Sequence, residues 1–180
     1  PAYVKAAAEA AMRAGFTKYT AASGIDELKS AIAEKLKADQ GLRYDKSQIL
    51  VSCGAKHALY NLAEALVEAG DEVIIPAPFW VSYQDQVRLN DATPVLLQTR
   101  EADGYAVDRA TLEAIVTPRT KAIIVNSPCN PTGATYDRAV LERIADVALQ
   151  RDLIIISDEI YEKILYDGAR HISIATLGPE

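Results

Sequence analysis

Three short segments of this chain are apolar at every position, not at every second one. They are residues 73–75, 123–125 and 153–156, and each consists only of valine, isoleucine or leucine. A strand with one face in water alternates apolar and polar residues, whereas a strand covered by helices on both faces is apolar throughout. Since parallel strands are joined by crossovers that are usually helical, these segments favour the parallel sheet of an α/β fold.

Helical and strand patterns alternate along the chain. Strands are expected at residues 47–52, 71–76, 93–98, 120–125 and 152–157. Helices are expected at residues 1–15, 25–41, 54–70, 81–89, 109–115 and 137–150, with Ser23 and Asp26 at capping-box spacing ahead of the second helix. The pattern predicts a three-layer α/β/α architecture around a mainly parallel sheet.

The composition limits the kinds of partner. The chain has 180 residues, 49% of them hydrophobic, which suits one globular domain with a substantial core. Its formal net charge of −6 speaks against nucleic acid as a partner. No apolar run approaches the ~20 residues that a membrane-spanning helix needs, so we expect no membrane segment.

Cysteines and histidines are few, which narrows the chemistry further. Cys53 and Cys129 are too few for a disulfide framework and favour reduced thiols in a cytoplasmic protein. His57 and His171 have no cysteine or carboxylate at ligand spacing in the sequence. We therefore expect no metal site.

The carboxyl ends of the expected strands carry most of the polar, aromatic and glycine residues. The segments are SCGAK, PAPFW, NSPCNPTG and SDEIYE, at residues 52–56, 76–80, 126–133 and 157–162. Ligands of open α/β sheets bind beyond the carboxyl ends of the strands. A binding site is therefore expected where these four segments meet.

The first segment can hold an anion. Gly54 opens an expected helix, so the N–H groups of Gly54, Ala55 and Lys56 lie at a helix N-terminus, where phosphate groups commonly bind. The alternative is an ordinary helix start with an exposed lysine, and this segment alone does not separate the two.

The next two segments offer an aromatic ring and an amide. Trp80 is the only tryptophan, and it either packs in the core or stacks on a planar ring. Asn130 stands between Pro128 and Pro131 after a buried strand. An amide at this place is expected to hydrogen-bond something, and the sequence at this point leaves its partner open.

The fourth segment places a carboxylate at the mouth of the core. Asp158 comes just after the apolar run at residues 153–156, where it is partly desolvated and needs a cation or a strong donor. Capping of a helix that begins at Glu159 is the alternative. Tyr161 follows in the same segment, and its phenol can donate to an oxygen.

These features match one small molecule. The requirements are an anion cradle, a stacking ring, a carboxylate for a cationic ring nitrogen and two donors that could share an oxygen. A phosphorylated, planar pyridine with a ring N–H and a phenolic oxygen meets all of them. That molecule is pyridoxal 5′-phosphate (PLP), so we predict PLP as the cofactor.

The sequence resembles the class I aminotransferases of PLP fold type I, close to the bacterial aspartate/prephenate aminotransferase branch. The motifs that carry the resemblance span nearly the whole chain: KYTAASGIDELKSAIAEK, VSCGAKHAL, GDEVIIPAPFWVSY, PRTKAIIVNSPCNPTGA and ISDEIYEKILYDG. The resemblance implies a transaminase that moves an amino group between an amino acid of the aspartate or glutamate type and a 2-oxo acid. It also implies a homodimer with shared active sites and a role in amino-acid metabolism.

The resemblance assigns roles around the cofactor ring. Trp80 is expected to stack on the pyridine ring, and Asp158 to partner its nitrogen. Asn130 and Tyr161 are expected to donate hydrogen bonds to the phenolic oxygen, with the Asn130–Pro131 peptide bond in the cis form. Trp80 and Asn130 are also expected to lie near the substrate.

The resemblance assigns the phosphate and the substrate side chain as well. Gly54, Ala55 and Lys56 correspond to the phosphate-binding turn, and Tyr19 to a tyrosine that reaches the phosphate in the neighbouring subunit. Lys56 also corresponds to a lysine that helps to hold the distal carboxylate of an acidic substrate. This match favours acidic amino donors.

One part of the family pattern is missing from these residues. The lysine that binds the cofactor covalently should lie in a Ser-x-x-Lys context, and no Ser-x-x-Lys occurs in this sequence. The chain also starts without methionine, within a helical pattern. We therefore name no catalytic residue here and expect residues 1–180 to be a partial PLP-binding large domain that is truncated at both ends.

Other functions remain open at this stage. The same motifs serve a carbon–sulfur lyase or a decarboxylase of the same fold type, since they bind the cofactor more than they choose the reaction. A PLP-sensing regulator domain fused to a DNA-binding module is a further alternative. A plain nucleotide-binding α/β domain is disfavoured, because neither a G-x-G-x-x-G nor a P-loop pattern is present.

Overall fold

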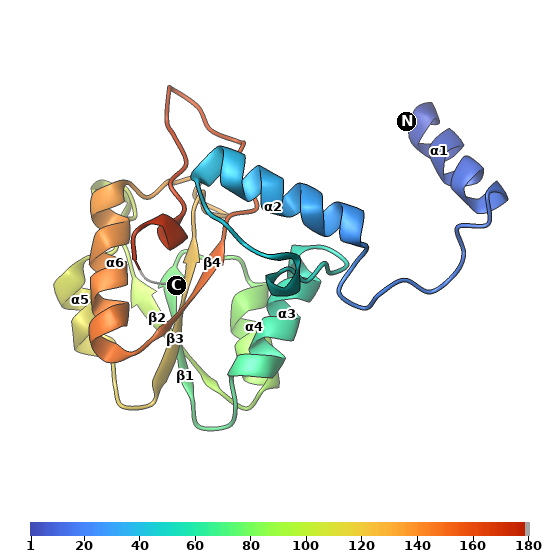
Figure 1. Cartoon of the computed structure of the whole chain (residues 1–180). Helices are drawn as coiled ribbons and strands as arrows, with labels where there is room; N and C mark the ends of the chain where they lie inside the picture. The colour runs from blue at the N-terminus through green and yellow to red at the C-terminus, as the bar shows by residue number, and fades with distance from the viewer. Residues whose placement is uncertain (179–180) are drawn as a thin grey trace.

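The computed structural model describes residues 1–178 as one sheet with helices on both faces (Figure 1). The α-helices are α1 (Ala2–Arg13), α2 (Asp26–Gln40), α3 (Ala55–Leu66), α4 (Ser82–Leu89), α5 (Arg109–Ile115) and α6 (Arg138–Arg151). The strands are β1 (Glu72–Ala77), β2 (Thr93–Gln98), β3 (Thr120–Asn126) and β4 (Ile154–Asp158). Short 3₁₀ turns are η1 (Lys46–Gln48), η2 (Glu101–Asp103) and η3 (Ile174–Thr176).

The four described strands are all parallel and lie in the order β2-β1-β3-β4. Their carboxyl ends therefore meet at one edge of the sheet. In the register of β3 with β4, Asn126 is the partner of Asp158. The predicted α/β/α class with a parallel sheet is confirmed.

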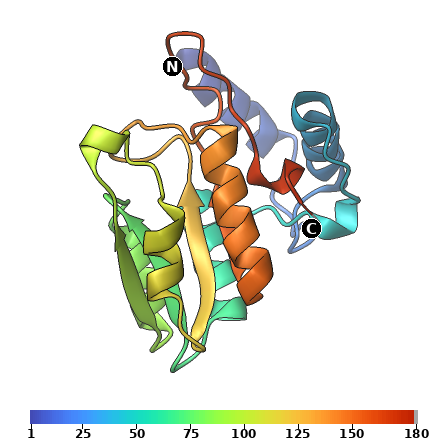
Figure 2. The same ribbon diagram turned by 90° about the vertical axis from the view of Figure 1, so that its left-hand side faces the viewer.

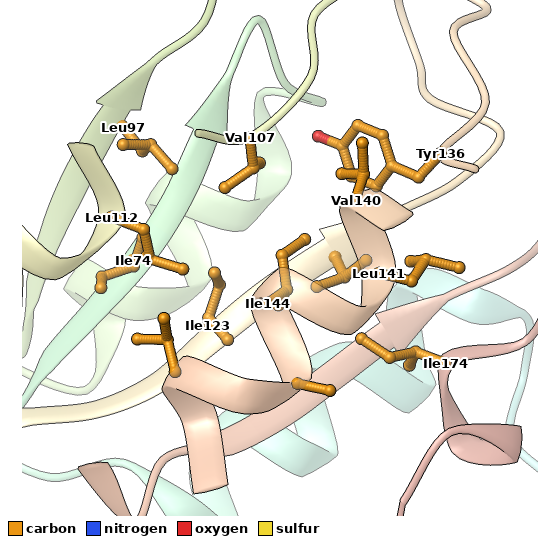
Figure 3. Packing of buried hydrophobic residues seen from close by; sticks show 13 residues of the cluster. Ile74, Leu97, Val107, Leu112, Ile123, Tyr136, Val140, Leu141, Ile144 and Ile174 are labelled. Atoms are coloured by element: carbon orange, nitrogen blue, oxygen red, sulfur yellow. The ribbon is translucent and has the colours of Figure 1, made fainter. Parts of the chain in front are cut away.

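Side chains that alternate along the strands build two separate cores. Ile74, Ile123 and Val125 point to the face that α5 and α6 cover, and Figure 2 looks onto this face. Ile144 and Leu141 of α6 belong to the same cluster, and Figure 3 shows Ile144 beside Ile123. Because helices cover this face and also the opposite one, described next, the strands are apolar at every position.

The opposite face is covered by α3 and α4. Val73, Ile75, Ala122 and Ile124 point to this side, and they pack with residues of both helices in a second cluster. Tyr83 of α4 belongs to this cluster and is 2% exposed. The second core therefore holds α4 against this face of the sheet.

The strand expected at residues 47–52 is wrong. This segment begins within η1 and continues as irregular chain, with Leu50 63% exposed. Val51 donates its N–H to the carbonyl of Ser23 over 3.0 Å and joins no strand among the described residues. A run of three apolar residues makes a strand only where a neighbouring strand pairs with it, and none does so here.

The start of α2 and the end of α3 differ from the prediction. The capping box of Ser23 and Asp26 is wrong, because the N-cap of α2 is Ile25. The hydroxyl of Ser23 accepts instead a hydrogen bond from Nζ of Lys29 over 3.1 Å. The helix that starts after Gly54 ends at Leu66 and does not continue to the expected Gly70.

Helix α1 lies apart from the sheet at the end of an extended segment (Figure 1), and none of its residues is buried. Among residues 1–178, no helix combines the length and the apolar character that a membrane crossing requires.

Candidate active site

A pocket lies at the carboxyl edge of the sheet, beside the point where the strand order changes direction. The chain passes from β1 outward to β2 and then returns to place β3 on the other side of β1. Open α/β sheets bind ligands in the crevice that such a switch creates. The cavity is about 240 Å³ and is lined by Ala55, Lys56, Trp80, Tyr83, Asn126, Asn130, Asp158, Ile160 and Tyr161.

The first wall of the pocket is the start of α3. Gly54 is its N-cap with φ +91° and ψ 167°, a conformation that side chains other than hydrogen rarely tolerate. The first N–H groups of a helix have no acceptor within the helix. The backbone of Ala55 and Lys56 therefore presents donors and the positive end of the helix dipole at the pocket wall.

The second wall comes from the segment between β1 and α4. Trp80 is partly buried there, and Nζ of Lys56 lies 5.0 Å from the centroid of its ring. This is a cation–π contact. Trp80 thus lines the pocket with a broad aromatic surface, and Lys56 adds a positive charge beside it.

The third wall is the loop after β3, which buried Asn126 organises. Its Nδ2 donates to the carbonyls of Asp158 over 2.9 Å and Pro128 over 3.1 Å, while its Oδ1 accepts the N–H of Asn130 over 2.8 Å. These bonds tie the loop to β4. The peptide bond between Asn130 and Pro131 is cis, as the resemblance implied.

The fourth wall is Asp158 at the end of β4. This carboxylate is 8% exposed. Its Oδ2 accepts the hydroxyl of Tyr83 over 2.6 Å, and its Oδ1 accepts the N–H of Ile160 over 3.2 Å. Burial and the bond to Asp158 raise the pKa of Tyr83, so the phenol remains a donor throughout the physiological pH range.

Most of the predicted site residues meet in this pocket. Six line it: Ala55, Lys56, Trp80, Asn130, Asp158 and Tyr161. Gly54 caps the helix at its wall. Tyr19 does not line the pocket; it is fully exposed in the segment between α1 and α2. All of these residues except Tyr19 therefore meet at this edge of the sheet, as predicted, although residues 54–56 reach it from the start of α3 and not from the end of a strand.

Sequence reasoning missed Tyr83 as a pocket residue and did not see that Asn126 lines the pocket. Tyr83 follows Trp80 by three residues and looks like an ordinary apolar position of α4. The available signal was the expected need of Asp158 for a strong donor, but sequence spacing does not reveal which residue supplies it. The alternative role of Asp158, as the cap of a helix, is wrong. The chain after β4 forms turns and not a helix.

The fold also creates a polar cluster that sequence spacing did not show. Ligand-type atoms of Glu159, Glu162 and His171 lie within 4.8 Å of one another. The carboxylate of Glu159 accepts a bond from Nε2 of His171 over 2.7 Å, and Glu162 pairs with Lys35 of α2. Because the ammonium group of Lys35 already pairs with Glu162, we interpret the cluster as an ion-pair network that connects α2 to the turn after β4.

Comparison with known proteins gives one consistent family. A family model described as aminotransferase class I and II matches residues 1–180. The aspartate aminotransferase of Geobacillus stearothermophilus is 47% identical over 180 residues, which are 100% of this chain and 46% of that protein. The aspartate/prephenate aminotransferase of Thermus thermophilus is 44% identical, with 100% and 46% covered.

A solved structure agrees with these relatives. The aspartate aminotransferase from Thermus thermophilus with maleate superimposes with a TM-score of 0.93 at 44% identity, covering 100% of this chain and 47% of that one. The chain thus spans about half the length of the proteins that it matches. Since the family model matches the chain over its full length, the chain belongs to the class I and II aminotransferase family.

Proposed function

We propose that the full-length protein is a PLP-dependent transaminase that moves an amino group between an acidic amino acid and a 2-oxo acid. The observation that carries the proposal is one pocket into which the start of α3 brings Lys56 and the ends of β1, β3 and β4 bring Trp80, Asn130 and Asp158. A family of aminotransferases supplies the reaction class.

The donor set of the pocket fits PLP. The helix start at Gly54, Ala55 and Lys56 would hold the phosphate, because it combines backbone donors with a positive dipole. Trp80 would stack on the ring, since a large aromatic face lines the cavity. The pocket thus offers an anion site and a stacking surface on neighbouring walls.

The polar rim fits the edge of the ring. Asp158, held by two donors, would partner the ring nitrogen and keep a proton on it. Asn130 and Tyr161 would donate to the phenolic oxygen, and Asn126 keeps Asn130 in place through its backbone N–H. When bound, PLP supplies a ring that withdraws electrons from the α-carbon of the amino acid.

The proposed substrate is a dicarboxylic amino acid. The ammonium of Lys56 lines the pocket beside Trp80, where it can pair with a distal carboxylate. Two similar proteins are named for aspartate, and a similar aspartate aminotransferase was solved with maleate, a dicarboxylate. These relatives support acidic donors for this protein.

We also propose a homodimer with shared sites. Tyr19 is fully exposed on the segment that carries α1 away from the sheet, so it is free to reach the phosphate of a partner subunit's cofactor (Figure 1).

We propose a cytoplasmic location as well, which is supported by the two cysteines, since both are free thiols.

The cofactor contacts alone do not distinguish a transaminase from the other PLP-dependent functions. A lyase, a decarboxylase or a cofactor-sensing regulator would use the same cofactor contacts, and no Ser-x-x-Lys, the context expected for the covalent lysine, occurs in these 180 residues. The transaminase is favoured because the similar proteins are named as aminotransferases.

Two assays on the full-length protein test the proposal. Apo protein titrated with PLP should develop the absorbance of the bound cofactor, and aspartate with 2-oxoglutarate should then yield oxaloacetate in a coupled assay. The variant Lys56→Ala should raise KM for aspartate about tenfold, since it removes a charge-assisted pair, and leave KM for alanine unchanged. Absence of PLP binding, or release of ammonia or CO₂ in place of amino transfer, would contradict the proposal.

A further inference from the structure

Tyr83 connects two walls of the pocket, the one formed by Trp80 and the one formed by Asp158. It sits in α4, next to the Trp80 segment, and its ring packs into the core under the sheet edge with 2% exposure. Its hydroxyl reaches the carboxylate of Asp158, which is 75 residues further along the chain. One side chain therefore contacts the carboxylate and lies beside the stacking ring.

The contact with Asp158 is short and charge-assisted. The hydroxyl donates to Oδ2 over 2.6 Å, which is within the range for O–H···O⁻ bonds. Burial and this bond raise the pKa of Tyr83, so the proton remains on the phenol. Since Oδ1 is held by the N–H of Ile160, both oxygens of the carboxylate are fixed while each retains a lone pair.

The contact with Trp80 is edge-on. The two ring centroids lie 5.4 Å apart and the planes meet at 87°, a favoured arrangement of aromatic pairs. Lys56 approaches the same tryptophan from the start of α3. Tyr83 thus restricts the plane of the ring that would stack on the cofactor.

We propose that Tyr83 is a positioning residue that holds Asp158 and Trp80 in the orientation needed for the cofactor ring. The inference rests on the proposed function. A space-filling role alone would need only the ring, and phenylalanine would supply it equally well. The hydroxyl is explained by its bond to Asp158, because a buried hydroxyl without a partner would be costly.

A double-mutant cycle tests the proposal through cofactor affinity. The variants Tyr83→Phe, Asp158→Asn and the double variant are made in the full-length protein, and the Kd of the apo form for PLP is measured by absorbance titration. Tyr83→Phe should raise this Kd about tenfold, the value of one charge-assisted hydrogen bond. In the Asp158→Asn background the same change should have little further effect, because it acts through the carboxylate.

Tyr136→Phe is the matched control. Tyr136 is also a buried tyrosine whose pKa is raised by burial, but it packs in the core cluster on the other face of the sheet. Its variant should leave the Kd for PLP unchanged. Steady-state kinetics add a second readout: Tyr83→Phe should lower kcat and leave KM for the amino donor unchanged.

The outcomes separate the inference from the proposed function. An unchanged Kd in Tyr83→Phe, or an equal loss of affinity in both backgrounds, would overturn the positioning role while leaving the transaminase intact. A wild-type protein that does not bind PLP would contradict the proposed function and the inference with it.

Discussion

Asp158 is the residue on which the proposed chemistry depends most. Its carboxylate is 8% exposed, it is held by Tyr83 and the backbone of Ile160, and it faces the cavity that also contains Trp80 and Asn130. Both of these donors are uncharged, so the carboxylate is placed to pair with a cationic group that enters the pocket.

The variant Asp158→Asn tests this role in the full-length protein. It keeps the shape of the side chain and removes the charge, so kcat should fall by about 100-fold or more while the fold is retained. Steady-state transamination assays measure the first effect, and the thermal unfolding midpoint measures the second. Near-normal turnover in a folded variant would contradict the assignment.

At the scale of residues, the sequence predicts the pocket only in part. Trp80, Asn130 and Asp158 stand out because a polar or large aromatic residue at the end of a core strand, or within a few residues of it, requires an explanation. Tyr83 does not stand out, since its function depends on a neighbour 75 positions away. Such pairings are set by the register of the sheet and the packing of α4, which local sequence does not record.

Among the elements, the strands that pair within the sheet are predicted well. Residues 120–125 and 93–98 were expected as strands and are found within β3 and β2. The segment at 47–52 fails although its apolar run is as long as those in β1 and β2, because no described strand pairs with it. The second helix keeps its expected end at Gly41, where φ is +75°, although its expected capping box is wrong.

The start of α3 gives a prediction for Gly54→Ala. At φ +91° and ψ 167° a Cβ meets no atom within 4 Å, so the cost of the substitution is backbone strain of about 1–3 kcal/mol. We expect lower stability and weaker PLP binding, because the helix start must shift. Gly41→Ala, also at positive φ but at the far end of α2, should lower stability and leave the Kd for PLP unchanged. Equal effects of both variants on Kd would contradict the phosphate role of the turn.

The junction of β1 and β3 gives a prediction on pH. Glu72 at the start of β1 accepts bonds from Oγ1 of Thr117 and Nη2 of Arg119, both over 2.6 Å, and these donors lower its pKa below the ordinary 4.5. The folded state therefore gains stability from the anion above the unfolded pKa, and loses it as pH falls through the folded value.

Glu72→Gln should accordingly lower the free energy of unfolding at pH 7 by about 1.5–3 kcal/mol. The difference from wild type should shrink as the pH falls from about 5 to about 3, across the range where carboxylates titrate. Urea unfolding of the full-length protein at several pH values measures it. Asp103→Asn removes an equally short but exposed pair with Arg100 and should change stability little. A difference at Glu72 that is independent of pH would contradict this account.

On the scale of the whole molecule, two cores hold one edge of a sheet in place. Helices α5 and α6 pack on one face and α3 and α4 on the other, so the segments after β1, β3 and β4 and the start of α3 have fixed positions relative to one another (Figure 1). The predicted class of fold is sufficient to anticipate this edge as a binding site. The depth and lining of the pocket follow only from tertiary packing.

The central claim is that this edge binds PLP against Trp80, and tryptophan fluorescence tests it most directly. Trp80 is the only tryptophan among these 180 residues. In the full-length protein, its fluorescence is obtained by subtracting the emission of the Trp80→Phe variant from that of the wild type. Addition of PLP to the apo protein should quench this emission strongly and saturably, with the same Kd as the absorbance titration. Emission from Trp80 that stays constant while PLP saturates the protein, or the absence of any binding, would contradict the account.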